Sequence, residues 1–145
     1  MTNTVSTSLS KTQLLDYYYQ RRAESSIGMG DRFELKSAVF GSSSLVTQNS
    51  SGTYDIADIP TKFALSDLTT QFATSDLTLS YADGVITLRA ELDSSGLDAN
   101  TSYPFNTLVV TDTAGLACMV LCVQEDSLYQ GKTFVAVSNI NTTVA

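Results

Sequence analysis

The side chains that most often carry enzyme chemistry are missing or scattered in this chain of 145 residues. Histidine is absent, so the commonest general base and metal ligand are lacking, and every Ser-His or Cys-His nucleophile is excluded. Paired carboxylates could still hydrolyse a glycosidic bond. The acidic pairs are Asp55 and Asp58, Asp93 and Asp98, and Glu125 and Asp126. Because such acids are typical of turns and loops, we expect no catalytic site and no enzyme activity.

The two cysteines, Cys118 and Cys122, are the remaining residues with reactive or metal-binding chemistry. They are four residues apart in a predicted strand, which separates their Cα atoms by about 13 Å, whereas a disulfide requires about 7 Å or less. We therefore expect both to be small buried hydrophobic side chains. No Walker A, EF-hand or Gly-x-Gly-x-x-Gly motif occurs, so the sequence predicts neither a metal nor a cofactor.

The first element of the chain is a predicted helix over about residues 10–25. Ser10 and Gln13 have the spacing of a capping box, in which each side chain bonds the backbone amide of the other residue. Leu9 and Leu14 have the spacing of a hydrophobic staple around the same start. The helix is expected to end in the stretch of serines and glycines that follows.

Three consecutive tyrosines, Tyr17, Tyr18 and Tyr19, lie on this predicted helix, and Arg21 and Arg22 follow them. Neighbours on a helix are about 100° apart, so the three rings cannot all face the core. The surplus ring either lies along the protein surface or contacts another chain, since tyrosines are enriched at interfaces. The arginines either form a solvated helix end or dock onto an acidic partner. These five residues are the candidate interface.

A β-hairpin is predicted over residues 77–90, because Asp83-Gly84 is a preferred pair for a two-residue type I′ turn. Pairing outward from this turn places six apolar residues on one face: Tyr81 opposite Ile86, Leu79 opposite Leu88, and Leu77 opposite Ala90. Polar residues fill the other face, so turn chemistry and hydrophobic pattern select the same register. The hairpin indicates an antiparallel sheet with one solvated side.

Further strands are predicted on both sides of this hairpin. Phe33, Leu35 and Val39 are expected to share one face of a strand over residues 33–40. Two long apolar runs late in the chain indicate strands covered on both faces, and a last strand is predicted after them. These three strands span residues 105–111, 116–123 and 133–138.

Together these elements predict an α+β, mainly β fold: an antiparallel β-sandwich-like domain with one N-terminal helix. At 145 residues the chain can bury enough surface for one independent core. We therefore expect a single domain over residues 1–145, with the helix at about 10–25 and the β-rich body at 33–140.

Composition and charge exclude several kinds of partner. The net charge of the chain is −7, but residues 1–36 are nearly neutral, with five basic and four acidic side chains. Residues 37–145 carry three basic and eleven acidic ones, so the body lacks the basic patch that nucleic-acid binding needs. No stretch approaches the ~20 apolar residues that span a bilayer, and the polar start lacks the features of a secretory signal. We expect a protein made and folded in a cytoplasm that binds neither nucleic acid nor membrane.

The order of parts is a short N-terminal helix, a strand ending in Ala38-Val39-Phe40-Gly41, a mid-chain hairpin, and a strand from Tyr103 that turns through Asp112–Gly115 into a second apolar strand. This order resembles the N-terminal tail-attachment domain of phage tail-collar fibre proteins. The resemblance implies a structural protein of the phage tail or baseplate that links a tail fibre or spike to the tail by protein–protein contacts. It also implies a homotrimer in the virion, with other tail or baseplate proteins as partners. Because no fibrous repeat follows, a free-standing adaptor subunit is expected.

An alternative interpretation is a β-sandwich binding module that recognises a surface carbohydrate. Such a site needs exposed aromatic side chains with polar partners, and tryptophan is absent. Tyr54, Tyr103 and Tyr129, in or beside predicted loops, are the candidate platform. A trimer that binds no glycan would favour the tail protein, and a monomer that binds sugars would favour this alternative.

Overall fold

The structure is a computed structural model, and it describes residues 10–142 of the chain. These residues form one long curled sheet, one small two-stranded sheet, one α-helix and two short 3-10 turns. In chain order the helix and strands are β1 (Lys11–Leu14), α2 (Asp16–Ser26), β2 (Leu35–Ser42), β3 (Val46–Gln48), β4 (Tyr54–Ile56), β5 (Thr70–Ala82), β6 (Val85–Leu92), β7 (Tyr103–Asp112), β8 (Ala117–Leu128) and β9 (Phe134–Asn141). The predicted α+β, mainly β class is confirmed.

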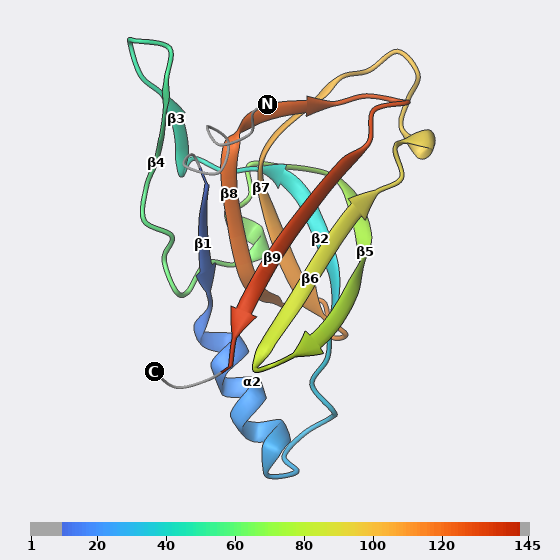
Figure 1. Ribbon diagram of the computed structural model, residues 1–145. Helices are drawn as coiled ribbons and strands as arrows, with labels where there is room; N and C mark the ends of the chain where they lie inside the picture. The colour runs from blue at the N-terminus through green and yellow to red at the C-terminus, as the bar shows by residue number, and fades with distance from the viewer. Residues whose placement is uncertain (1–9, 143–145) are drawn as a thin grey trace.

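The long sheet has the strand order β1-β8-β7-β2-β5-β6-β9, and every neighbouring pair is antiparallel. The sheet curls until β9 crosses in front of β7 and β8 (Figure 1). Its two halves therefore face each other as the layers of a sandwich do, although they belong to one continuous sheet. Helix α2 lies at one end of the curl, beside the turn that joins β5 and β6 (Figure 1).

Aromatic rings fill the inside of the curl. Phe40 of β2 and Phe105 of β7 are fully buried, with ring centroids 5.9 Å apart. Phe134 of β9 packs edge-on against both rings, at centroid distances of 5.7 and 4.9 Å. Each such pair contributes about 0.5–1.5 kcal/mol beyond the burial of area. Because β9 is the last strand in the sheet order, these contacts keep the sheet curled.

The outer face of β2, β7 and β8 is covered as well. Val39, Val109 and Val120 point to this face and pack against Leu15 and Phe63 from the segments that cross it. The small β3–β4 hairpin adds further apolar side chains to the same cluster. The expectation that the two long apolar runs are covered on both faces is therefore confirmed, and they form β7 and β8.

Both cysteines lie in β8, fully buried and free of any disulfide. Burial raises the pKa of the Cys118 thiol to about 12. It also raises the pKa of Cys122, which packs with Val109 and Val120 under the outer cover. Both thiols are therefore protonated at neutral pH, as expected for small hydrophobic side chains.

The predicted hairpin is present with the predicted register. Leu77 pairs with Ala90, Leu79 with Leu88, and Tyr81 with Ile86. The turn residues Asp83 and Gly84 have φ values of 51° and 83°, which is the left-handed pair that a type I′ turn requires. The predicted last strand is also present, as β9, and it extends to Asn141.

The predicted start of the helix is wrong. Residues Lys11–Leu14 form β1, and α2 begins only at Asp16. Gln13 donates from its side chain to the carbonyl oxygen of Leu14 instead of capping a helix, and Leu9 lies outside the described residues. One edge of β8 pairs with β7, and the other edge pairs with β1 from Met119 to Cys122. This non-local pairing outweighs the local capping signals.

The expected common face of Phe33, Leu35 and Val39 is also wrong. Strand β2 runs from Leu35 to Ser42, and its register with β7 shifts between Leu35 and Ser37. Since one extra residue reverses the direction of the following side chains, Leu35 packs inside with Phe33, whereas Val39 faces the outer cluster.

Candidate protein–protein interface

Helix α2 is fixed to the sheet by its middle tyrosine. The Tyr18 side chain is buried and packs with Leu35, Val110 and Met119 at the open end of the curl. Its ring meets Phe33 edge-on, with centroids 5.6 Å apart. Tyr18 is therefore the ring that faces the core, and it sets which sides of α2 face outward.

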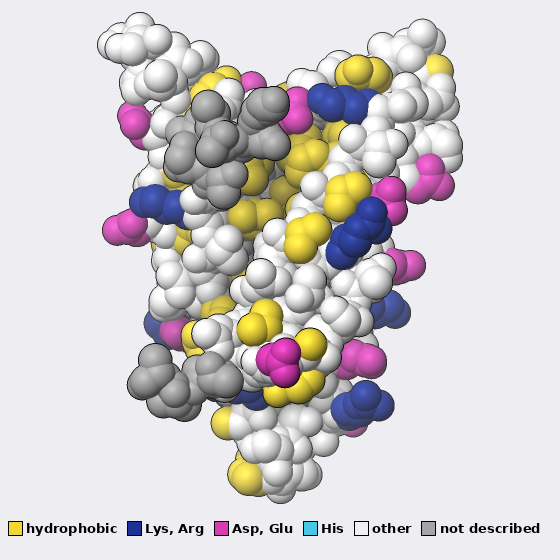
Figure 2. All heavy atoms as spheres, viewed as in Figure 1, with side chains coloured by type: hydrophobic (Ala, Val, Ile, Leu, Met, Phe, Trp, Pro, Cys, Tyr) yellow, Lys and Arg dark blue, Asp and Glu magenta, His cyan; other side chains and the backbone are white. Residues whose placement is uncertain are grey.

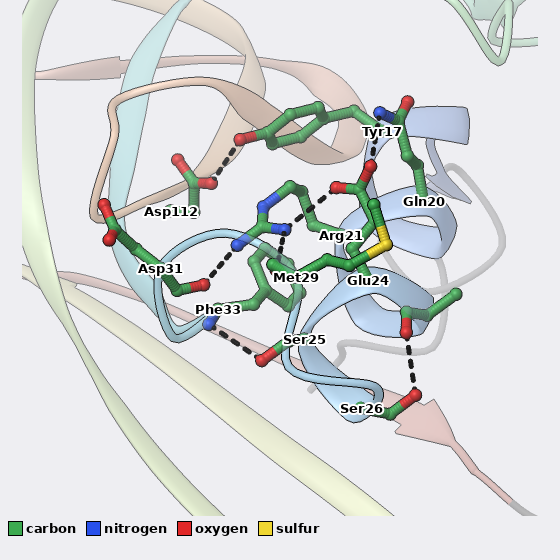
Figure 3. A network of polar contacts seen from close by, with 11 residues as sticks. Tyr17, Gln20, Arg21, Glu24, Ser25, Ser26, Met29, Asp31, Phe33 and Asp112 are labelled. Atoms are coloured by element: carbon green, nitrogen blue, oxygen red, sulfur yellow. Dashed lines mark hydrogen bonds and ion pairs between the residues drawn. The ribbon is translucent and has the colours of Figure 1, made fainter.

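Tyr17 ties the helix to the turn between β7 and β8. Its hydroxyl donates to Oδ2 of Asp112 at 2.7 Å (Figure 3). The buried Asp112 carboxylate also accepts from the backbone amides of Ala114 and Leu116, at 3.0 Å each. Burial and the hydrogen bond to this carboxylate raise the pKa of Tyr17 to about 12. Tyr17 is thus held in place by the protein itself.

Replacing Tyr17 with phenylalanine should lower the free energy of unfolding by about 1–2 kcal/mol, because Asp112 loses one of its donors. The effect should depend on pH. The folded-state pKa is about 12 against an ordinary value of 10.0, so this stabilisation is complete below pH 10 and is lost as the pH rises toward 12. Urea unfolding of both proteins at several pH values measures the difference.

The matched control is Tyr19→Phe, which removes a hydroxyl from an exposed ring and should change stability by less than about 0.5 kcal/mol. A Tyr17→Phe cost that stays constant from neutral pH to pH 11 would show that the Asp112 hydrogen bond does not stabilise the helix as described.

Arg21 connects helix α2 to the loop that follows it. It forms an ion pair with Oε1 of Glu24 at 2.9 Å, and its guanidinium also donates to the backbone carbonyls of Met29 and Asp31 (Figure 3). Hydrogen bonds from Arg21 and then Gln20 hold the pKa of Glu24 below its usual range. Arg21 therefore shapes the end of α2.

Tyr19 and Arg22 are the two candidates that face solvent. The Tyr19 side chain is 46% exposed, and its ring meets Tyr18 edge-on at a centroid distance of 5.5 Å. The Arg22 guanidinium carbon lies over both rings, 5.5 Å from Tyr18 and 5.3 Å from Tyr19. These contacts hold the Tyr19 ring and the Arg22 side chain in place before any partner binds. Exposed aromatic rings and arginines contribute much of the binding energy at protein interfaces.

A hollow of about 690 Å³ opens beside this pair. The helix contributes Arg22 and Ala23 to its wall, and Phe33 follows from the loop after α2. Leu79 and Ile86 form the opposite wall, near the tip of the β5–β6 hairpin. We call Tyr19, Arg22 and the lining of this hollow the helix-end surface.

Sequence reasoning missed the hairpin side of this surface. The signal was present, because the apolar face of the hairpin extends to Leu79 and Tyr81, and these side chains remain 39% and 67% exposed in the folded protein. Two further apolar side chains, Ile27 and Met29, are exposed where the helix ends. Exposed apolar side chains that gather at one end of a protein are typical of an interaction site.

The three tyrosines of the expected sugar-binding platform each contact a different part of the protein. The Tyr103 ring is stacked on Phe72 with centroids 5.0 Å apart. Tyr54 packs on the outer cluster, and Tyr129 is exposed with the Lys132 ammonium 5.6 Å from its ring centroid. The described contacts do not assemble these rings into one platform.

Several of the acidic residues have structural partners. Asp93 accepts hydrogen bonds from the amide and hydroxyl of Ser95, which lower its pKa, and Asp126 pairs with Lys132 at 2.9 Å. Among residues 10–142 there is no group of three or more side chains able to hold a metal. In the same part of the chain, no helix has the length and apolar character to cross a membrane.

Comparison with known proteins gives a whole-chain match. The family model described as bacteriophage P1 tail fiber protein R matches residues 1–145. A relative named Tail fiber protein R, from Escherichia phage P1, is 57% identical over 141 residues, which cover 97% of this chain and 98% of the relative. No solved structure matches the chain significantly.

Proposed function

The chain belongs to the family of bacteriophage P1 tail fiber protein R and is a structural protein of the phage tail; from this we propose that it links a tail fibre or spike to the tail by protein–protein contacts alone. The helix-end surface is the proposed attachment site. The observation that carries the proposal is the exposed Arg22, which lines an apolar hollow and holds its guanidinium over the exposed ring of Tyr19.

The charge of the protein supports attachment at this end. Within the described residues, ion pairs engage five of the cationic side chains: Lys11, Arg21, Lys62, Arg89 and Lys132. Arg22, Arg32 and Lys36 form no ion pair with a described residue, and all three lie on α2 or soon after it. The rest of the protein is acidic. The partner surface is therefore expected to be acidic around an apolar centre.

In this proposal Tyr19 and Arg22 contact the partner, whereas Tyr17, Tyr18 and Arg21 hold the helix in the position that presents them. The protein acts without catalysis, and its partners are other tail or baseplate proteins. It folds as a single domain in the host cytoplasm and is carried in the virion tail. A homotrimer is part of the proposal, supported by the exposed Ile27 and Met29, which association would bury.

Antibody labelling of purified phage particles tests the proposed role. Label at the tail, close to where fibres attach, is the expected result, and its absence from particles that carry intact tails would contradict the proposal. Sedimentation of the purified protein tests the trimer separately. A species of three copies is expected over a wide concentration range, and a monomer at all concentrations would contradict it.

A further inference from the structure

Two apolar side chains project into solvent where helix α2 ends. Ile27 is 72% exposed and Met29 is 52% exposed, and neither belongs to a described cluster of buried side chains. Their backbone amides both donate to the carbonyl oxygen of Glu24, at 3.2 and 2.8 Å. Figure 2 shows hydrophobic side chains at this lower tip of the molecule. The fold therefore holds Ile27 and Met29, which we call the apolar knob, outside its core.

A small hollow on the side of the protein is separate from the helix-end surface. It has a volume of about 200 Å³ and lies between α2, the β7–β8 turn and the segment that precedes β5. It shares no lining residue with the larger hollow beside Arg22. We call it the side hollow, and its mainly apolar lining includes Tyr17, Phe63, Ala64, Leu65, Leu116 and Ala117.

Hydrogen bonds within the chain fix the walls of the side hollow. Asp112 accepts from the Tyr17 hydroxyl at 2.7 Å and from the Leu116 amide at 3.0 Å. In the segment before β5, Asp67 accepts from the Ala64 amide at 2.9 Å. The hollow is therefore formed before any partner binds. Because it is smaller than the ~300–1,000 Å³ of small-molecule sites, it fits one or two protein side chains.

The charges beside the knob and the hollow are complementary. Arg32 lies three residues after Met29, is exposed, and forms no ion pair with a described residue. Asp67, whose carboxylate bonds the Ala64 amide in the wall of the hollow, is also exposed and has no ion pair within residues 10–142. A second copy of the chain therefore offers both apolar side chains for the hollow and a cation for its edge.

We propose that the apolar knob of one copy enters the side hollow of the next copy, with Arg32 of the first beside Asp67 of the second. Knob and hollow are different surfaces, so the contact is head-to-tail, and it forms a closed ring when the rotation between copies closes. The inference rests on the homotrimer of the proposed function and identifies the surfaces that form it. Attachment through the helix-end surface uses a different hollow and can be tested separately.

Disulfide crosslinking tests the contact directly. Full chains carrying either Met29→Cys or Ala64→Cys are co-expressed, purified and oxidised. Cys118 and Cys122 are buried and should stay reduced. The expected product is a linked pair with one chain of each kind, identified by mass spectrometry, whereas Met29→Cys co-expressed with Val137→Cys should give none. A single chain carrying both Met29→Cys and Ala64→Cys should give a covalent trimer. A covalent dimer alone, or a ladder beyond three copies, would overturn the ring.

Reversing the charges tests the pairing of Arg32 with Asp67. Arg32→Asp and Asp67→Arg should each raise the concentration at which the trimer dissociates, by about fivefold or more, and the two changes together should largely restore it. Sedimentation equilibrium measures the dissociation, and circular dichroism checks the fold. Asp98→Arg is the matched control, because Asp98 is also exposed and also accepts from a backbone amide, that of Asn100. A combined variant as weak as the two single variants would show that these charges do not meet.

Removing the knob tests the apolar part of the contact. Ile27→Asp with Met29→Asp should raise the dissociation concentration of the trimer about tenfold or more. Tyr129→Asp with Val137→Asp makes the same kind of change at exposed side chains elsewhere and should leave the trimer intact.

The outcomes separate this contact from the rest of the proposed function. A trimer that persists after the knob is removed and gives no mixed disulfide would overturn this contact alone. An unmodified protein that sediments only as a monomer would overturn the homotrimer and this contact together, and incorporation into particles would still test attachment. The variant with Tyr19→Ala and Arg22→Glu should form the trimer normally. Its dissociation into monomers would show that assembly and attachment use the same surface.

Discussion

Replacing Gly41 with alanine is expected to lower the free energy of unfolding of the protein severely. A Cβ atom at Gly41 would lie 2.0 Å from the carbonyl oxygen of Thr70 and 3.0 Å from its carbonyl carbon. These are backbone atoms of the paired strand β5, at a point where the β2–β5 register shifts. Because no side chain can move aside, the strands must separate locally, and we expect a cost of about 3 kcal/mol or more. Urea unfolding followed by circular dichroism measures it.

Gly96 provides the matched control. A Cβ atom there would meet no other atom within 4 Å, so Gly96→Ala should change the free energy of unfolding by less than about 0.5 kcal/mol. Equal stability of the Gly41→Ala and Gly96→Ala proteins would contradict the close approach of β2 and β5 and, with it, the position of the strand bearing Phe40.

Changing Tyr19 to alanine and Arg22 to glutamate together should reduce incorporation of the protein into phage particles by about tenfold or more, since an aromatic ring and an arginine at the centre of an interface carry much of its energy. The fold should remain, because both side chains face solvent; they lose the edge-on contact between Tyr19 and Tyr18 and the cation–π contacts of Arg22, each worth about 0.5–1.5 kcal/mol. Quantitative blotting of purified particles, made in cells that supply only the variant, measures incorporation.

The control for this variant is Tyr129→Ala with Arg89→Glu, which makes the same chemical changes at exposed residues of a loop and of β6. It should be incorporated normally. Arg21 is left unchanged, because its loss would free Glu24 and the loop after α2 and would confuse misfolding with failed attachment. Normal incorporation of the Tyr19 and Arg22 variant would contradict attachment through the helix-end surface.

The parts of the fold that were predictable rest on local signals. Asp83-Gly84 and the alternation around it determine both a turn and a register, so the hairpin could be placed residue by residue. The start of α2 could not, because β1 exists only through pairing with β8, about a hundred residues later. The shift at Leu35–Ser37 also depends on a distant strand, β7.

The candidate site was predictable only in part, for a similar reason. Helical spacing shows that three consecutive tyrosines cannot share one environment, but it does not show which ring is buried. That choice depends on Phe33 and Leu35, which Tyr18 contacts. Likewise, nothing in the sequence distinguishes Arg21 from Arg22. In the folded protein the loop after α2 places the carbonyls of Met29 and Asp31 beside Arg21, and this contact fixes its structural role.

The most direct test of attachment through α2 is a photo-crosslinking measurement in the assembled particle. Tyr19 is replaced with benzoylphenylalanine in one protein and Tyr129, at the other end of the molecule, in a second. After irradiation of purified particles, position 19 should crosslink to another tail protein, and position 129 should give much less of that product. Efficient crosslinking from position 129 with none from position 19 would contradict the account.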